Sequence, residues 1–334
     1  VIDKILEWQQ RTGFRPSLYT WLTVNLYKLD RLMTKMRLAG FDMLFIGVES
    51  FSRNSLLETA KVQNSATDMV EVIRKIQSYG FIVVAGLIFG FDSDDETCFD
   101  ATLTGLKKSA LLSGDPSLLT ALPGTPLYRR MKLSGRLRQV RFGLGGYKYQ
   151  TNITYLLPTD VIIDGYKRFV TGFCDGAYQY GRLKDFFDLL GQGNFVPMDG
   201  QGFGNLWLFL RMILGNRAAL WQMTQRLARF LVRPSNLYYA LKGLGLALSH
   251  LDIKGRFGYF QFWLFAWTNA VLKYQNISAS DFDIDSVGAE FDIGRILPNE
   301  YATPADEDIP VQKINAQLRA TVSQLESVVA ERSA

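Results

Sequence analysis

The sequence predicts an α/β protein in which parallel strands alternate with helices over residues 1–135. Two segments, "FDMLFIGVES" (41–50) and "FIVVAGLIFG" (81–90), are almost entirely apolar, the pattern of strands buried on both faces of a parallel sheet. Segments with apolar residues at helical spacing separate the strands and end in glycine. The strand–helix–strand pattern repeats about four times, which indicates a parallel sheet or part of a barrel.

The predicted elements follow one another with short connections, and each is recognised by its apolar periodicity and its end signals. In order they are a helix at 1–13, a strand at 17–25, a helix at 28–40, a strand at 41–50, a helix at 65–80 capped by Ser65, a strand at 81–90, a helix at 95–112, a short strand at 116–124 and a helix opened by Pro126. Residues 159–190 are again helical in pattern.

Changes in composition divide the chain into five predicted segments. They are a partial barrel at 1–135, a glycine-rich lid with helices that complete the barrel region at 136–200, a basic and aromatic helical extension at 201–278, an acidic linker at 279–310 and an amphipathic C-terminal helix at 311–334. The chain begins at Val1 within a helix-like phrase, so we expect it to be the later part of a longer protein.

The helical extension has an uneven charge. Residues 205–278 hold nine Lys or Arg and one acidic residue, together with four of the six tryptophans. One interpretation is a peripheral contact with anionic lipid, through which a lipid-like substrate enters. The other is a helical subdomain whose aromatic residues pack on the barrel. Nucleic-acid binding is disfavoured, because the basic residues alternate with bulky apolar ones.

Composition limits the class of protein further. The chain has 334 residues, of which 48% are hydrophobic, and a net charge of +5. The longest uncharged run, 257–272, is shorter than the roughly 18 to 20 residues of a membrane span. Two cysteines cannot form a disulfide framework and no secretory signal is recognisable, so we expect a cytoplasmic protein, with contact at the membrane surface left open.

Three strand ends carry candidate ligand-binding residues, because ligands of parallel α/β sheets gather where the strands end. These ends read "IGVES" (46–50), "GLIFGFDSD" (86–94) and "TALPGTPL" (120–127). Glycines within the second end permit close approach of a ligand to the backbone. All three ends are expected to open on the same side of the sheet.

Each strand end also has a purely structural interpretation. Glu49, followed by Ser50, could complement the dipole of the next helix, and Asp92 could be a helix N-cap. The prolines of the third end could simply shape a turn, or they could present the backbone groups of Ala121 and Leu122 to a flat ligand. A phosphate loop is excluded, since no Lys-Ser/Thr follows the glycines and acidic residues would repel phosphate. The ends therefore favour a neutral or cationic ligand with hydroxyl groups.

In this order, the segments "GFDMLFIGVES", "GLIFGFDSDDETCF", "LLTALPGTPLYRRMKLSGRL" and "TNITYLLP" resemble the cobalamin-dependent type of radical S-adenosylmethionine protein. More narrowly, they resemble the subgroup with a helical C-terminal extension that includes hopanoid methylases and related enzymes. The resemblance implies an incomplete TIM-like (β/α) barrel with about four parallel strands present here, across whose ends S-adenosylmethionine lies.

The resemblance also implies which residues contact the cofactor. Glu49 would lie at the ribose edge, and Gly86, Ile88 and Gly90 beside the adenine. Leu122 would lie at the edge of the following strand, which also borders the adenine. The implied set of S-adenosylmethionine-binding residues is Thr23, Asn25, Glu49, Ser50, Gly86, Ile88, Gly90, Asp92 and Leu122. No catalytic residue is implied, and no metal site built from side chains of this chain is expected.

The sequence departs from the family pattern in its cysteines. The family holds a [4Fe-4S] cluster with a CxxxCxxC motif, and iron–sulfur ligation needs clustered thiolates. Cys98 and Cys174 are isolated in the sequence. We therefore expect the cluster ligands to lie in a missing N-terminal part, and the chain alone to be inactive.

For the intact protein, the resemblance implies electron transfer from the cluster to S-adenosylmethionine, formation of a 5'-deoxyadenosyl radical and hydrogen abstraction from an unreactive carbon. The substrate would be a small or lipid-like molecule, and cobalamin is a candidate further cofactor. The alternative function is a binding or scaffold protein that lacks the cluster and retains half of a barrel. The oligomeric state is not indicated by the sequence.

Overall fold

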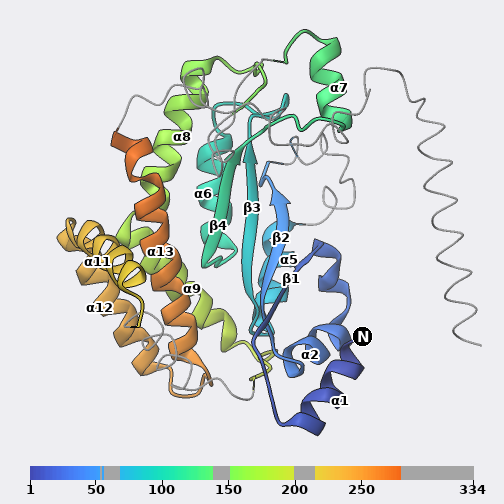
Figure 1. Ribbon diagram of the computed structural model, residues 1–334, viewed down its shortest axis with the longest axis vertical. Coiled ribbons are helices and arrows are strands. Elements are labelled where there is room, and N and C mark those ends of the chain that lie inside the picture. The colour runs from blue at the N-terminus through green and yellow to red at the C-terminus, as the bar shows by residue number, and fades with distance from the viewer. Residues whose placement is uncertain (53–54, 56–67, 138–150, 199–214, 280–334) are drawn as a thin grey trace, which may run out of the picture.

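A computed structural model describes residues 1–52, 55, 68–137, 151–198 and 215–279 (Figure 1). Residues 280–310 of the predicted acidic linker and the predicted C-terminal helix lie outside these residues, as do residues 138–150 of the glycine-rich lid. The sheet contains four parallel strands in the order β1-β2-β3-β4, which confirms the predicted α/β class with about four parallel strands. The strands are β1 (Leu18–Leu22), β2 (Phe41–Glu49), β3 (Ile82–Phe89) and β4 (Ser113–Leu118).

Helices connect and flank the strands much as the periodicity predicted. They are α1 (Ile2–Thr12), a 3-10 helix η1 (Val24–Lys28), α2 (Asp30–Leu38), α5 (Met69–Ser78), α6 (Cys98–Lys108) and α7 (Pro126–Leu133), followed by α8 (Thr159–Phe173), α9 (Gly176–Leu190), α11 (Arg217–Leu231), α12 (Pro234–Ser249) and α13 (Arg256–Ala279). The strand predicted at 17–25 ends at Leu22, because the chain turns into η1.

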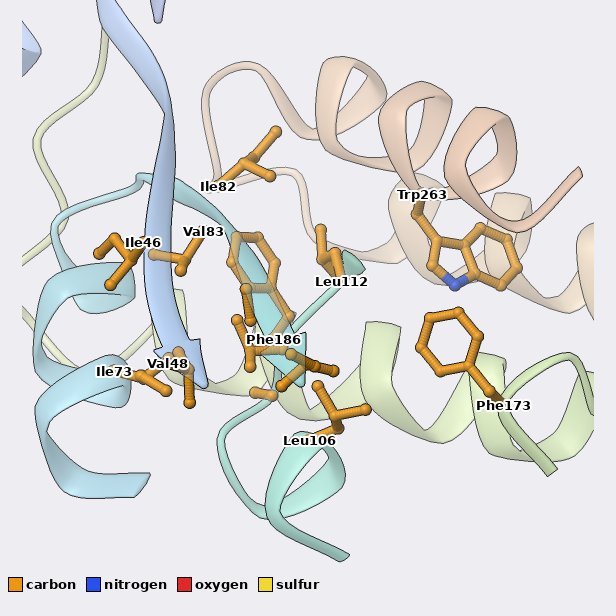
Figure 2. Close-up of a cluster of buried hydrophobic side chains, with 14 of the residues drawn as sticks. Ile46, Val48, Ile73, Ile82, Val83, Leu106, Leu112, Phe173, Phe186 and Trp263 are labelled. Carbon is orange, nitrogen blue, oxygen red and sulfur yellow. The ribbon is translucent and has the colours of Figure 1, made fainter. Parts of the chain in front are cut away.

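The sheet is not buried on both faces, so that prediction is wrong. Side chains alternate along β2 and β3: Ile46 and Val83 are fully buried, whereas Phe45 and Val84 on the opposite face are only half-buried. The buried face packs against residues of α5 and α6, such as Ile73 and Leu106 (Figure 2). We call the half-buried face the inner face, because the predicted barrel would enclose it.

Element boundaries differ from the predictions where local hydrogen bonds decide them. The helix predicted at 65–80 has Asp68 as its N-cap, whose carboxylate accepts a hydrogen bond from the Val70 N–H at 2.9 Å. The predicted cap, Ser65, lies outside the described residues. Strand β4 begins at Ser113 rather than 116, and Pro116 is tolerated within it because β4 is an edge strand.

The helical extension shares one hydrophobic core with the sheet. The core cluster reaches from Ile46 and Val48 to Phe173 and Trp263 (Figure 2). Trp263 and Trp267 of α13 are almost fully buried, and each indole N–H donates to a backbone carbonyl: Trp263 to Gln179 at 3.1 Å and Trp267 to Cys174 at 3.0 Å. These two tryptophans therefore pack on the body of the protein.

Helix α13 is the longest described helix, with 24 residues, and it runs beside α8 (Figure 1). Polar residues such as Gln261 and Asn269 interrupt its apolar sequence. Within the described ranges, no helix combines the length and hydropathy that crossing a membrane requires.

Candidate functional site

The candidate site lies where the four parallel strands end. The register pairs Glu49 of β2 with Leu87 of β3, and Phe89 of β3 with Leu118 of β4, so these strand ends share one edge of the sheet. We call it the carboxyl edge. Thr23 follows β1 directly and precedes η1, and it is exposed. Asn25 lies within η1 and is half-buried.

Glu49 has an unusual backbone conformation. It ends β2 with a φ of 67°, in the left-handed region that residues other than glycine rarely adopt. The pairing register of β2 and β3 shifts between Gly47 and Glu49, so the strand is irregular at this point. Such a conformation costs on the order of 1 to 3 kcal/mol and is typical of functional sites.

Ser50 lies beside Glu49, but it is buried and forms hydrogen bonds within the chain. Its N–H donates to the Val48 carbonyl at 2.9 Å, and its Oγ accepts a hydrogen bond from the Ser52 N–H at 3.0 Å. These contacts stabilise the turn that leaves the strand. Ser50 therefore supports the conformation of Glu49 in this structure.

Aromatic rings pack against two glycines, one within β3 and one directly after it. A Cβ atom at Gly86 would lie 3.1 Å from the ring of Phe45, and Gly90, with a φ of 101°, faces the ring of Tyr155. The space that we expected for an adenosyl group beside these glycines is thus occupied by rings of the chain itself. Ile88, between them, packs in a small second core cluster together with Tyr155.

A buried carboxylate organises the loop after β3. Asp94 accepts hydrogen bonds from the N–H groups of Gly90 at 2.8 Å and Phe91 at 3.1 Å, and from the Ser55 hydroxyl. Sequence reasoning missed Asp94, although the short "FGFDSD" pattern of glycine followed by acids is typical of side chains that bond nearby backbone groups. The loop shape therefore depends on Asp94.

Asp92 is not the N-cap that its position suggested. Helix α6 begins at Cys98 with Thr97 as its N-cap residue. The carboxylate of Asp92 instead accepts two hydrogen bonds from the guanidinium of Arg136, at 2.6 and 2.9 Å. The hydrogen bonds to Arg136 hold the pKa of Asp92 below its ordinary value. This ion pair joins the loop after β3 to the segment after α7.

The backbone of Ala121 is paired within the chain, which agrees with the structural interpretation of this strand end. The Asn152 side chain accepts a hydrogen bond from the Ala121 N–H at 2.9 Å and donates one to its carbonyl at 2.7 Å. Leu122 is half exposed, and its carbonyl accepts a hydrogen bond from the Thr125 hydroxyl. Asn152 belongs to "TNITYLLP", so the motif indicated this segment but not its contact.

The described residues do not fit an iron–sulfur cluster. Cys98 and Cys174 are both buried and lie on different helical segments. Burial raises the pKa of the Cys98 thiol, and it raises that of Cys174 to about 12, which disfavours the thiolates that bind iron. Among the described residues there is no group of three His, Cys, Asp or Glu side chains placed to hold a metal ion.

The fold and its carboxyl edge define an α/β protein of the parallel-sheet type. A family model described as a domain of unknown function (DUF4070) matches residues 125–279. The chain is 32% identical to the hopanoid C-2 methylase of Rhodopseudomonas palustris over 167 residues, covering 50% of this chain and 31% of that protein. It is 28% identical to an uncharacterized methyltransferase of Synechocystis sp. over 183 residues, covering 55% and 34% respectively.

A bacteriochlorophyllide d C-12(1)-methyltransferase of Chlorobaculum tepidum is 31% identical over 94 residues, covering 28% of this chain and 21% of that protein. The matched segments span about a third or less of these relatives. These matches confirm the predicted resemblance to hopanoid-methylase-like proteins: the chain is a sequence relative of methyltransferases.

Solved structures give a weaker likeness. A cobalamin-dependent S-adenosylmethionine radical enzyme with aqua-cobalamin and S-adenosylmethionine bound covers 83% of this chain and 44% of its own, with a TM-score of 0.39 and 14% sequence identity. At this TM-score the likeness adds nothing about the site.

Proposed function

We propose that this chain carries part of the S-adenosylmethionine and substrate site of a radical methyltransferase that modifies a small or lipid-like molecule. The sequence relatives named as a methylase and methyltransferases support methyl transfer as the reaction class. A [4Fe-4S] cluster would be bound outside the described residues, and cobalamin would be a further cofactor.

The observation that carries the proposal is the strained Glu49 at the carboxyl edge. Glu49 has a φ of 67° and is the last residue of a parallel strand, the place where ligands of such sheets bind. A carboxylate accepts hydrogen bonds from hydroxyl groups and attracts a cation. Both properties suit S-adenosylmethionine, which has two ribose hydroxyls and a sulfonium.

The chain's own residues would bind and orient the cofactor, while the cofactor supplies the chemistry that activates carbon. Glu49 would hold the ribose, with Ser50 and its turn keeping the backbone in position. Thr23 and Asn25 would border the same edge from η1. The adenine would have to lie beyond the ring of Tyr155, because that ring fills the space at Gly90.

The test is equilibrium binding of S-adenosylmethionine to the full-length gene product. Glu49→Gln removes the charge but keeps the size, and we expect affinity to fall about tenfold, since a hydrogen bond to a charged group contributes about 1.5 to 3 kcal/mol. Ala110→Gly is the matched control, because Ala110 also has a positive φ, of 55°, but follows α6. If Glu49→Gln bound S-adenosylmethionine with unchanged affinity, the role of Glu49 would be structural.

The alternative, a binding or scaffold protein without a cluster, predicts a different result. Reconstitution of the full-length product with iron and sulfide would then give no cluster absorbance, and incubation with S-adenosylmethionine and a reductant would give no 5'-deoxyadenosine. Both signals are expected if the proposed function is correct.

We also propose that α11 and α12 contact an anionic membrane surface. Leu237, Leu241 and Leu248 recur at helical spacing along α12 and are about half exposed, and Trp221 of α11 is 64% exposed. Basic residues on the same two helices include Arg229 and Lys242. An apolar stripe with interspersed cations is the pattern of a helix lying in a lipid interface.

Co-sedimentation with vesicles tests this contact. We expect binding to phosphatidylcholine vesicles that contain phosphatidylglycerol, and weaker binding to phosphatidylcholine alone. Leu241→Asp should reduce binding, whereas Leu133→Asp, at an 82% exposed leucine of α7, should not. Equal binding to both vesicle types, or association of the protein with itself through the same face, would contradict the proposal.

A further inference from the structure

A small cavity lies between helices α8 and α13 and the turn that joins α11 to α12, residues 232–233. Helix α13 packs against both α8 and α11 in this part of the molecule (Figure 1). The cavity has a volume of about 40 Å³. Since roughly 10 to 15 Å³ of such space holds one water molecule, about three waters or one tetrahedral phosphate group fit inside.

The cavity has an apolar floor and a cationic rim. Val170, Cys174 and Val271 line it and are buried. Arg229 of α11 and Arg233, the N-cap residue of α12, also line it, and both are exposed, so a ligand can reach them from solvent. Charges of one sign in a cleft with apolar walls concentrate their electric field, so the cavity attracts anions.

The charge of Arg233 reaches the floor of the cavity. Burial raises the pKa of the Cys174 thiol to about 12, and the positive charge of Arg233 opposes that rise. Arg182 of α9, which is fully buried, acts on the same thiol in the same direction. The space beside Cys174 is therefore favourable for negative charge.

The chain supplies no counter-ion to these two arginines. None of the ion pairs among the described residues includes Arg229 or Arg233. Helices α11 and α12 contain no Asp or Glu. Asp175, the residue after Cys174, caps α9 instead, because its carboxylate accepts a hydrogen bond from the Tyr178 N–H at 2.8 Å. Two cations at one small cavity repel each other, and an anion from outside the chain would offset that cost.

Exposed apolar side chains adjoin the two arginines. Val232 lies between them in the sequence, lines the cavity and is 71% exposed, and Leu231 beside it is 47% exposed. A phospholipid presents this combination of groups, since its phosphate is joined through glycerol to acyl chains. The phosphate would meet the arginines, while the first carbons of the chains would lie against Val232 and Leu231.

We propose that this cavity binds a phosphate group through the guanidinium groups of Arg229 and Arg233. A guanidinium offers parallel N–H donors that match two phosphate oxygens. The exposed Val232 favours the headgroup of a phospholipid as the source of the phosphate, and inorganic phosphate shares the same chemistry. With a lipid as the source, the inference rests on the membrane contact proposed above and names the group that this contact recognises.

Calorimetric titration of the full-length gene product with soluble probes tests the site. Dihexanoylphosphatidylglycerol, used below its critical micelle concentration, carries phosphate and short chains; dihexanoylglycerol lacks the phosphate, and inorganic phosphate lacks the chains. We expect the phospholipid to bind at least about tenfold more tightly than dihexanoylglycerol, a ratio that corresponds to one hydrogen bond to a charged group. Tighter binding of the phospholipid than of inorganic phosphate identifies a lipid source, and the reverse order identifies free phosphate.

Arginine variants locate the binding. Arg229→Gln and Arg233→Gln should each weaken binding of the phospholipid about tenfold, and since both residues are exposed, we expect both variants to fold. Arg226→Gln is the matched control, because it removes the same charge from α11. The guanidinium of Arg226 lies 5.2 Å from the centroid of the Phe265 ring, and Arg226 does not line the cavity. Its affinity should equal that of the wild-type protein.

Two results would overturn the inference. One is equal affinity for dihexanoylphosphatidylglycerol and dihexanoylglycerol, together with no binding of inorganic phosphate. The other is an equal loss of affinity in Arg226→Gln and Arg229→Gln, which would reflect net charge alone. If the phospholipid binds in solution while co-sedimentation with vesicles fails, the membrane contact is contradicted and the phosphate site is supported.

Discussion

Asn152 pairs with both backbone hydrogen-bonding groups of Ala121, at 2.9 and 2.7 Å, as a neighbouring strand would. Both residues are buried. The Thr151 hydroxyl and the Tyr155 hydroxyl donate to the Leu119 carbonyl nearby, at 2.8 and 3.0 Å. The segment around Asn152 therefore takes the place of a further strand beside the chain that leaves β4.

Replacing Asn152 should be costly, because Asn152→Ala leaves the N–H and the carbonyl of Ala121 buried and unpaired. We expect the free energy of unfolding to fall by about 2 to 4 kcal/mol, measured by urea denaturation. Asn194→Ala is the control, since Asn194 is exposed and makes one hydrogen bond, to the Ser78 hydroxyl. A similar small loss in both variants would show that the Asn152 contacts contribute little.

The ion pair of Asp92 with Arg136 should make stability depend on pH. The pKa of Asp92 is below its ordinary value in the folded protein, so the pair contributes stability above about pH 4. That contribution is lost as the pH falls through the folded-state pKa. We expect Asp92→Asn to lower the free energy of unfolding by about 1 kcal/mol at pH 7 and the difference to disappear in acid.

The surface pair of Lys184 and Asp188 serves as a control for this prediction, since both side chains are about half exposed. Asp188→Asn should have little effect at either pH. If Asp92→Asn lost the same stability at every pH, a change in packing rather than the loss of charge would be responsible.

Tyr259 connects the helical extension to the sheet region. Its hydroxyl donates to the Gly80 carbonyl at 2.8 Å and accepts a hydrogen bond from the buried guanidinium of Arg37 at 3.2 Å. Tyr259→Phe leaves both partners with one hydrogen bond fewer, so we expect a loss of about 1 to 3 kcal/mol in thermal or urea unfolding.

Because α13 and the sheet share one core, near-ultraviolet and far-ultraviolet circular dichroism of this variant should still report a single transition. Tyr238→Phe, at an exposed tyrosine of α12, should leave the midpoint unchanged. Two separate transitions would contradict a shared core.

The two cysteines should be chemically inert in the folded chain. Both are buried, and burial raises the pKa of each thiol. We expect Ellman's reagent at pH 8 to modify neither thiol until guanidinium unfolds the protein, when both react. Rapid reaction of the native chain would contradict the buried placement and reopen a role for these thiols as ligands.

Much of the fold follows from local signals in the sequence. The strands β2 and β3 are mostly apolar runs that each follow a glycine, and α2, α5 and α7 have helical periodicity with recognisable ends, so their class and order are predictable. Asp68 replaced Ser65 as the N-cap residue of α5, because several polar residues there can cap a helix and only the backbone conformation selects one. Three motifs also placed the candidate site at the carboxyl edge.

The sequence by itself determined the alternation of strands and helices, and it indicated the edge at which their ends meet, because both depend on periodicity over a few residues. The tertiary structure alone decided that one face of the sheet is fully buried and the other only half-buried, that Arg136 is the partner of Asp92, and that Asn152 forms hydrogen bonds with the backbone of Ala121. These contacts join residues 31 or more positions apart. No local pattern encodes such pairs, since they form only when packing brings distant segments together.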